Sequence, residues 1–322
     1  MKPKFNLMLD SGAHHFFEKH VRKGTGIWDR HLWNWGAYKS DAFTNYTNDY
    51  IHFLKENKSI FDVYVVNDAI YDPEVTYGNY CYMKYTHGLN PMPVYHFAED
   101  IKWFKLYMKE TDYIGISGLG QGISKNDYIE WADEVFELLC DNEQRIPTHK
   151  IHGFALTSVN LMKRYPYFSV DSSSWVQYSK YGMILLPKTK NGVYDYEENP
   201  LKVFVSTRSP KVKEEGFHYQ NSAQYQKKYT RDYLKSIKVP FGKSKFKVVD
   251  ADYKLKKDEK LVEDYADKGR KKIEKIVVPG VSNRHEFRDA VNFMFFTQLG
   301  HKLPKWPWSW KRRSKCKTLG IL

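Results

Sequence analysis

The chain of 322 residues contains only three cysteines and no long apolar segment. Cys81, Cys140 and Cys316 lie far apart, which excludes a disulfide framework and a CxxC metal knuckle. No apolar run approaches the roughly 18 residues that a membrane span requires, and the N-terminal segment lacks the apolar core of a signal peptide. We therefore expect a soluble protein of the reducing cytoplasm with no membrane partner.

Positive charge is scarce in the first part of the chain and concentrated in the second. Residues 1–200 contain 21 Lys and Arg against 25 Asp and Glu, whereas residues 201–322 contain 30 against 13. A basic segment beside a nearly neutral one is typical of proteins that bind a phosphate backbone. We therefore expect a nucleic-acid partner, with a merely solubilising lysine-rich surface as the alternative.

Short apolar runs alternate with amphipathic segments over the first half of the chain. The runs that predict strands are 5–9, 61–66, 93–97, 112–117, 150–156 and 167–170. The segments with helical spacing are 40–58, 98–110, 124–142 and the span to Arg164. This alternation is typical of parallel α/β proteins, and six strands followed by polar residues favour a TIM-type (β/α)8 barrel.

The pattern changes after Tyr181. Two apolar runs flank an Asn191-Gly192 turn, which predicts a hairpin. Residues 224–237, 256–276 and 284–299 are predicted to be helical. We therefore expect a catalytic barrel core over residues 1–206 and a basic helical extension over 207–322 that completes the barrel and binds nucleic acid.

Two aromatic segments stand outside this pattern. Residues 13–39 are rich in aromatic residues and glycine and are predicted to form a long loop. The segment Trp306–Trp310 precedes a basic cluster. The tryptophans of both segments could stack on exposed bases, although packing in the core is the commoner role of a single tryptophan.

Polar residues follow the predicted strands. They are Asp10, Asp68, His96, Gln121 and Asp171. Because the carboxyl ends of parallel strands meet at one edge, two of these carboxylates could divide the roles of nucleophile and proton carrier, as retaining glycosyl transfer requires. The alternative for Asp171 is that it caps the next helix. The glycine turn at 118–122 has neither the GxGxxG pattern nor a P-loop lysine, and it indicates only close approach to a flat ligand.

Several segments together resemble the tRNA-guanine transglycosylases. MLDSGAHHFF is similar to the DSGGFQ segment of that family, and ISGLGQG is similar to its GGLAVGE turn. HGFALTS and SVDSSSW resemble the strand pair that ends in the family's nucleophilic aspartate, and NGVYDY and SNRHEF resemble later regions. The resemblance covers most of the chain in order.

Three differences separate the chain from the tRNA enzymes. The CxCxxC zinc motif is missing, the Leu-Pro-Thr-Arg after the nucleophile is absent, and Ala13-His14-His15 replaces Gly-Phe-Gln. The chain therefore looks most like the bacteriophage enzymes that insert 7-deazaguanine bases into DNA. If it is encoded by a phage, its compartment is the cytoplasm of the host cell.

The resemblance implies a function and a set of site residues. It implies exchange of guanine in DNA for a free 7-deazaguanine base of the preQ0 type, with Asp171 as nucleophile and Asp10 as proton carrier. The residues expected to bind the base are Ser11, Asp68, His96, Gly118, Leu119, Gly120 and Gln121. Those expected to bind the nucleic acid are Lys227, Lys228, Lys271, Lys272, Lys311, Arg312 and Arg313.

Other functions are compatible with the same residues. They are exchange on tRNA, retaining glycoside hydrolysis with water as acceptor, and nucleic-acid binding without chemistry. We expect no cofactor and no metal, although His14, His15, His20 and His31 leave a replacement metal site open. The particular 7-deazaguanine, the target context and the oligomeric state do not follow from the sequence.

Overall fold

The computed structural model describes residues 6–23, 30–118, 123–209, 218–265 and 269–312. The chain forms two compact units. Unit 1 comprises residues 1–157, 164–171 and 305–322, and unit 2 comprises residues 158–163 and 172–304. Each unit is therefore assembled from segments that are separate in the sequence, and each is described by itself.

Unit 1 contains parallel strands that neighbour one another in chain order. They are β1 (Met8–Leu9), β2 (Val63–Tyr64), β3 (Val94–His96), β4 (Tyr113–Ser117), β5 (Lys150–Gly153) and β6 (Ser169–Val170). β1 pairs with β2, and β3, β4, β5 and β6 form one sheet in that order. A parallel bridge between Val65 and Met92 links the end of β2 to the approach of β3. The predicted α/β class is confirmed, and the eight-stranded barrel stays a prediction.

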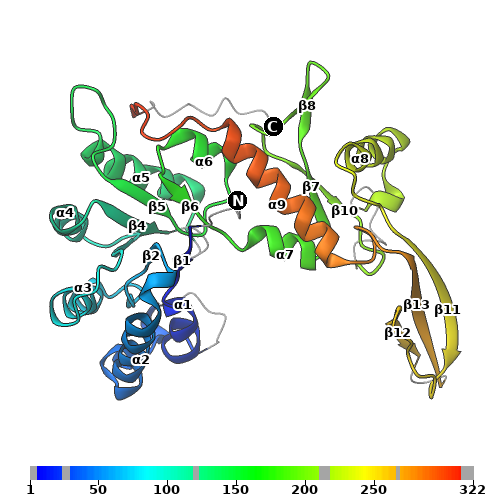
Figure 1. The fold of residues 1–322 in the computed structure, drawn as a ribbon, viewed down its shortest axis with the longest axis horizontal. Coiled ribbons are helices and arrows are strands. Elements are labelled where there is room, and N and C mark those ends of the chain that lie inside the picture. Colours follow the sequence, from blue (N-terminus) through cyan, green and yellow to red (C-terminus); the bar gives the residue numbers. More distant parts are fainter. Residues whose placement is uncertain (1–5, 24–29, 119–122, 210–217, 266–268, 313–322) are drawn as a thin grey trace. The chain divides into compact units, whose positions relative to one another are not determined.

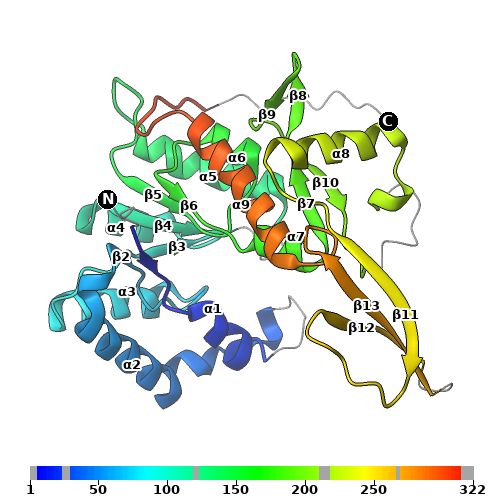
Figure 2. The same cartoon turned by 45° about the vertical axis from the view of Figure 1, so that its right-hand side comes forward.

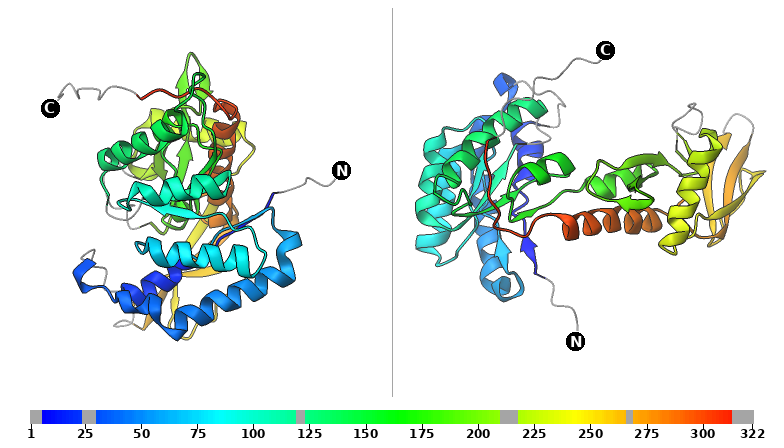
Figure 3. Two further views of the ribbon diagram at one scale, coloured as in Figure 1. Left: turned by 90° about the vertical axis from the view of Figure 1, so that its left-hand side faces the viewer. Right: turned by 90° about the horizontal axis from the view of Figure 1, so that it is seen from above.

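The helices between these strands begin where the sequence supplies caps. The helices of this part are α1 (Ala13–Phe16), α2 (Asp41–Asn57), α3 (Pro73–Cys81), α4 (Ile101–Glu110), α5 (Lys125–Leu139) and α6 (Val159–Arg164). The side chains of Ser40, Asp72 and Ser124 each accept a hydrogen bond from the first turn of the following helix. Helices α2, α3, α4 and α5 flank the strands, and their apolar faces supply much of the buried core (Figures 1 and 3).

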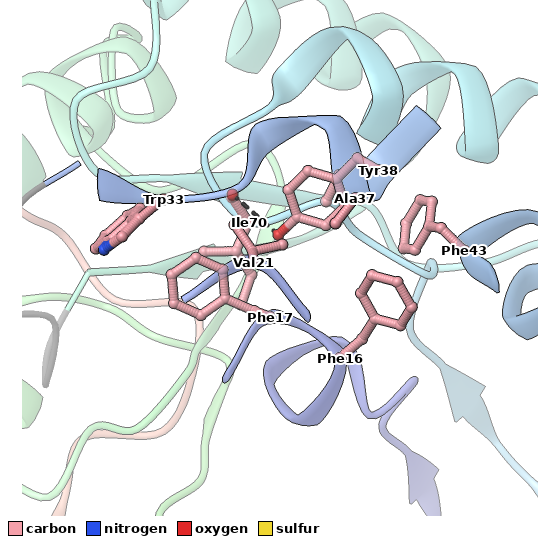
Figure 4. Packing of buried hydrophobic residues seen from close by; sticks show 9 residues of the cluster. Phe16, Phe17, Val21, Trp33, Ala37, Tyr38, Phe43 and Ile70 are labelled. Atoms are coloured by element: carbon pink, nitrogen blue, oxygen red, sulfur yellow. Dashed lines mark hydrogen bonds between the residues drawn. The ribbon is translucent and has the colours of Figure 1, made fainter. Parts of the chain in front are cut away.

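The long loop predicted over residues 13–39 is wrong for the described part of that segment. It forms α1, a π-helical turn at Phe17–Val21 and 3-10 turns at Arg30–Leu32 and Trp35–Lys39. Aromatic side chains of these turns pack on α2 and Ile70 (Figure 4). Burying them also buries their backbone, whose N–H and C=O groups must then be paired, and helical turns provide that pairing.

The predicted core role of two tryptophans is confirmed. Trp33 is buried in the cluster of Figure 4, where its ring meets that of Phe17 edge-on at 5.1 Å. Trp310 is also buried, and it stacks on Tyr165 with ring centroids 6.0 Å apart. Neither ring is available to a base in this arrangement.

Unit 2 is built mainly from antiparallel strands and helices, and it includes most of α6. Its elements are α7 (Ser174–Lys180), β7 (Met183–Leu186), β8 (Lys188–Lys190), β9 (Val193–Asp195), β10 (Leu201–Phe204), α8 (Gln224–Ser236), β11 (Lys243–Asp250), β12 (Glu259–Tyr265), β13 (Arg270–Val278) and α9 (His285–Lys302). β7 pairs with β10, and β8 pairs with β9 across the turn at Asn191 and Gly192. The predicted hairpin and the helices at 224–237 and 284–299 are therefore confirmed.

The helix predicted over residues 256–276 is wrong. This segment contains β12 and most of β13, which form a three-stranded antiparallel sheet with β11 (Figure 2). Its lysines and glutamates suit a helix, but Ile273, Ile276 and the valines that follow suit a pleated strand. Pairing with β11 satisfies the backbone of β13 along its length and overrides the local preference.

The aromatic cluster of unit 1 provides a test of the fold. Phe16 is 3% exposed and packs against Phe43, with ring centroids 4.9 Å apart. Phe16→Ala should destabilise unit 1 by about 3–5 kcal/mol, as removal of a buried phenyl ring usually does. Urea unfolding followed by circular dichroism measures the loss. The control is Phe53→Ala, because Phe53 is 44% exposed; an equal loss in both variants would contradict the assignment of the core.

Candidate active site

The carboxyl ends of the parallel strands of unit 1 hold the polar residues that the sequence predicts there. Asp10 follows β1, Asp68 follows β2, His96 ends β3 and Asp171 follows β6. His96 contacts Asp68, and the carboxylates of Asp68 and Asp171 both act electrostatically on Asp10. The structure therefore brings these four side chains into one neighbourhood.

His96 forms a buried ionic group with Asp68 and Glu99 at this site. Nε2 of His96 lies 3.0 Å from Oδ2 of Asp68, and Nδ1 lies 3.2 Å from Oε1 of Glu99. Burial by itself lowers the pKa of His96, but the charge of Glu99 and the hydrogen bonds with Asp68 and Glu99 outweigh it and raise the pKa to about 10. His96 is therefore a cation at neutral pH that is held between two carboxylates.

Glu99 reaches His96 through a tight turn that the sequence reasoning missed. Ala98 has a φ of 67°, in the left-handed region, and the Glu99 amide donates to the His96 carbonyl at 3.3 Å. The Glu99 carboxylate in turn accepts a hydrogen bond from the His96 amide at 2.9 Å. The only sequence signal was a glutamate three residues after a strand-end histidine, which does not reveal a left-handed alanine.

Helix α2 orients the turn that carries Asp10. The hydroxyl of Tyr46 donates to the Ser11 carbonyl at 2.8 Å, and the hydroxyl of Tyr50 donates to the Val65 carbonyl at 2.8 Å. Gly12 has a φ of 75°, and a Cβ there would lie 2.4 Å from the Tyr46 hydroxyl oxygen. Glycine is required at this position because no side chain fits between the turn and the tyrosine.

Asp10 is exposed to solvent, yet its pKa is raised. The protein that surrounds the carboxyl group desolvates it, and the charges of Asp68 and Asp171 add to the shift, while backbone amides of the turn oppose it. Ser11, predicted to bind the base, is buried instead, and its hydroxyl lies 3.4 Å from Oδ1 of Asp68. Asp10 is the carboxyl group of this site that is best suited to hold a proton.

Asp171 is held by His152 of the neighbouring strand β5. Nε2 of His152 lies 3.4 Å from Oδ1 of Asp171, and the Ala155 amide donates to the same oxygen at 3.0 Å. On its other side, Nδ1 of His152 lies 2.6 Å from the hydroxyl of Ser169, which also contacts the hydroxyl of Tyr113 at 2.6 Å. A line of polar contacts thus crosses β4, β5 and β6 and ends on Asp171.

These contacts shift the pKa of Asp171 in the direction opposite to that of Asp10. Burial alone would raise the pKa of Asp171, but the adjacent imidazole of His152, together with the Ala155 amide, lowers it. The side chain is 58% exposed, and both contacts are made to Oδ1, so neither holds Oδ2. Asp171 therefore combines a stabilised anion with an oxygen that a ligand can approach.

The alternative role of Asp171 as a helix cap is wrong. Helix α7 begins at Ser174, its N-cap residue Ser173 makes no side-chain cap bond, and the Ser174 amide donates to the Ser172 hydroxyl at 3.0 Å. Ser172 is bonded instead to Ser174, with their hydroxyl oxygens 2.9 Å apart. The Asp171 carboxylate is directed to His152 and Ala155 rather than to the helix.

The remaining residues predicted to bind the base are described only in part. Gly118 is buried, and a Cβ there would lie 3.1 Å from Cβ of Phe97 and 3.2 Å from the ring of Tyr128. Leu119, Gly120 and Gln121 lie outside the described residues. His96 is 1% exposed with both ring nitrogens engaged, so the structure shows it as a partner of Asp68. Its contact with a base stays a prediction.

The residues predicted to bind nucleic acid are divided between the units. Lys227 and Lys228 lie on α8 and Lys271 and Lys272 on β13, all in unit 2, whereas Lys311 belongs to unit 1. Arg312, also of unit 1, lies 3.7 Å from a carboxylate oxygen of Asp133. Arg313 lies outside the described residues.

Neither a metal site nor a membrane helix occurs in the described part of the chain. Within it, no group of three histidine, cysteine or carboxylate side chains is arranged to hold a metal ion. His96 illustrates why, because its two nitrogens point to different carboxylates instead of converging with them on one point. Among the same residues we find no helix with the length and hydrophobicity to span a bilayer.

Comparison with known proteins yields no relative. No family model, no curated protein and no solved structure matches the chain.

The buried histidine makes the stability of unit 1 depend on pH. The folded protein keeps a proton on His96 up to about pH 10, whereas the unfolded chain releases it near the usual value of about 6.5. The stabilisation is therefore complete below about pH 6.5 and is lost as the pH rises toward 10. The difference in unfolding free energy between the protein and His96→Gln should shrink over this range, as measured by urea titrations.

Glu99→Gln is the companion variant. It removes the carboxylate that contributes most to the raised pKa of His96, so the loss of stability should be smaller and should be complete at a lower pH. A difference between the protein and His96→Gln that is constant from pH 6 to pH 10 would contradict a protonated His96.

Proposed function

We propose that this protein is a base-exchange transglycosylase that replaces guanine in DNA with a free 7-deazaguanine base. One observation carries the proposal. Of the carboxylates that follow the first and sixth parallel strands, Asp171 raises the pKa of Asp10 by its charge, and the pKa values of the two residues are shifted in opposite directions. Double displacement at a sugar carbon needs one carboxylate to form the covalent intermediate and a second to carry the proton.

In the first step, Asp171 attacks C1′ of the target nucleoside. The bond from C1′ to the base nitrogen N9 breaks, and an ester bond forms between C1′ and a carboxylate oxygen of Asp171. The departing guanine receives a proton from Asp10, whose raised pKa suits a proton donor. His152 and the Ala155 amide keep Asp171 ionised and oriented before the attack.

In the second step, the incoming 7-deazaguanine takes the place of guanine. Asp10, now deprotonated, accepts the proton from N9 of the new base, and N9 attacks C1′. The ester bond to Asp171 breaks, which restores both carboxylates. Two inversions at C1′ retain the configuration of the sugar.

Asp68 is suited to recognise the base. Its oxygens already contact Ser11 and His96, but each carboxylate oxygen can accept a second hydrogen bond. The contact with His96 holds the buried Asp68 carboxylate in position, so that it can accept from the amino and ring N–H groups of a purine-like base. In this proposal His96 is a positioning residue that acts through Asp68.

The basic part of the chain supports a polynucleotide substrate over a neutral sugar. The +13 net charge of the chain arises from residues 201–322, which are mostly in unit 2. A target base in a duplex must leave the stack before its C1′ can be attacked, at a cost of a few kcal/mol. Phosphate contacts from the basic surface can offset part of that cost.

The nucleophile can be tested by trapping. Asp171→Asn should form no covalent adduct with guanine-containing DNA and should not exchange labelled guanine, because an amide cannot displace the base. Asp10→Asn should still form some adduct but exchange about 10²- to 10⁴-fold more slowly, the usual contribution of a proton carrier. Denaturing gels and radiolabel exchange measure both. Asp195→Asn, a carboxylate of β9 in unit 2, is the control and should exchange normally. An adduct in Asp171→Asn would remove this residue from the role.

His152 provides a second test through the pH dependence of exchange. Asp171 must be ionised to attack, so the rate rises with pH through its pKa. His152→Phe removes the contact that lowers this pKa and should shift the acid limb to higher pH, with about a 10- to 100-fold loss of kcat. His152→Gln, which keeps a donor, should restore part of the rate. Tyr113→Phe is the control, because Tyr113 contacts Ser169 and not Asp171, and it should leave the acid limb of the pH–rate profile nearly unchanged. If the acid limb of His152→Phe is not shifted, His152 does not have the proposed role.

The polymer is identified by comparing acceptors. Labelled guanine should enter duplex DNA and not tRNA. Entry into tRNA alone would select the tRNA enzyme, and release of guanine without exchange would select hydrolysis.

A further inference from the structure

A cavity in unit 2 gathers basic side chains from elements that are distant in the sequence. Its volume is about 630 Å³. The basic residues that line it are Lys180, Arg208, Lys260, His285 and Arg288. They come from the end of α7, the turn after β10, strand β12 and the first turn of α9. All of these residues belong to unit 2, whereas the carboxylates of the candidate active site belong to unit 1.

Described carboxylates balance the charge of the cavity only in part, and among its basic residues His285 contacts Glu286, with Nδ1 3.5 Å from Oε2. Lys180, Arg208 and Lys260 form no ion pair with any described carboxylate. Arg288 is 6% exposed, and its Nε and Nη1 donate to the carbonyls of Ser179 and Val281, each at 2.7 Å. Its Nη2 carries no hydrogen bond to a described residue. Because Arg288 lines the cavity, this nitrogen is placed to donate to a ligand there.

The basic groups act on one another across the cavity. Burial lowers the pKa of Lys260, and the charges of Arg284 and Arg208 lower it further, against weaker opposing effects of Glu286 and Glu274. Burial is also the main cause that lowers the pKa of Arg288, and Arg208 adds to it, although Asp289 and Glu286 oppose the shift. Positive charges that destabilise one another in this way would be stabilised by an anion between them.

The walls of the cavity are fixed by backbone contacts. Gly182 has a φ of 87°, and a Cβ there would lie 2.6 Å from Cβ of Ser206. The Gly182 carbonyl accepts hydrogen bonds from the amides of Val205 at 2.8 Å and Ser206 at 3.2 Å. Asn283, another lining residue, donates hydrogen bonds to the Ser244 hydroxyl and the Val278 carbonyl. The cavity is therefore built before a ligand arrives.

We infer that this cavity binds a phosphate group, with Arg208 and Lys260 as its principal ligands and the free nitrogen of Arg288 as a third. Arginine suits phosphate because its guanidinium presents paired donors in a plane, and lysine supplies a compact charge. The volume exceeds that of a single phosphate and lies in the range of small-molecule sites, so there is room for a nucleoside as well. The phosphate belongs either to a nucleic-acid strand or to a free nucleotide. The first of these sources rests on the proposed function.

The test compares two variants of the full chain that lose the same charge. Arg208→Gln with Lys260→Gln removes two cations from the cavity, and Lys188→Gln with Lys190→Gln removes two exposed lysines from β8. Arg288 is left in place because its hydrogen bonds hold α7 and α9. Binding of a fluorescent duplex DNA is measured by anisotropy at several salt concentrations, and binding of dGMP and inorganic phosphate is measured by calorimetry.

For a nucleic-acid phosphate, the cavity variant should bind the duplex at least about 10-fold more weakly than the β8 variant, as removal of hydrogen bonds to a charged group predicts. The slope of the logarithm of its binding constant against the logarithm of the salt concentration should also decrease in magnitude by about 0.9 for each phosphate that the variant no longer neutralises. For a free nucleotide, the intact protein should bind dGMP, and only the cavity variant should lose that binding. Equal binding of every ligand by the two variants would overturn the inference. None of these measurements depends on base exchange. A failure of this inference can therefore be distinguished from a failure of the proposed transglycosylase activity.

Discussion

Parallel pairing of the strands of unit 1 is the constraint on which the site depends. Because consecutive parallel strands all point the same way, the residue that follows each strand arrives at the same edge. Asp10 and Asp171 are 161 positions apart in the chain, yet the charge of Asp171 helps to raise the pKa of Asp10 at that edge. Helix α2 supports the arrangement because its tyrosine hydroxyls bond the main chain beside β1 and β2.

Electrostatics then distinguishes carboxylates of one chemical type. Asp68 is buried and balanced by a protonated histidine, Asp10 is desolvated beside two other carboxylates, and Asp171 is stabilised by His152 and a backbone amide. Three aspartates thus have three different electrostatic environments. The proposed division into base recognition, proton transfer and nucleophilic attack follows from these differences.

Unit 2 has a different physical character. Its antiparallel strands and α9 pack around an apolar cluster that includes Ile184, Val291 and Leu234, while its surface carries most of the excess positive charge. On β11 and β13, Lys245 and Lys275 are direct cross-strand partners, an arrangement that costs stability unless an anion lies nearby. Glu259 of β12 lies opposite Lys275 on its other side, so this contact is partly balanced within the sheet.

The sequence alone determined the α/β class, the positions of most strands and helices before residue 175, and the aspartates at the strand ends. These follow from local periodicity, capping residues and the polar residue after each apolar run. It did not reveal the helical turns at 13–39 or the β-sheet at 243–278, because long-range packing and pairing override local preference there. It also missed Glu99 and His152, since a left-handed turn at Ala98 and the pairing of β5 with β6 place them beside Asp68 and Asp171. The opposite pKa shifts of Asp10 and Asp171 belong to the tertiary structure, because they arise from neighbours that only folding supplies.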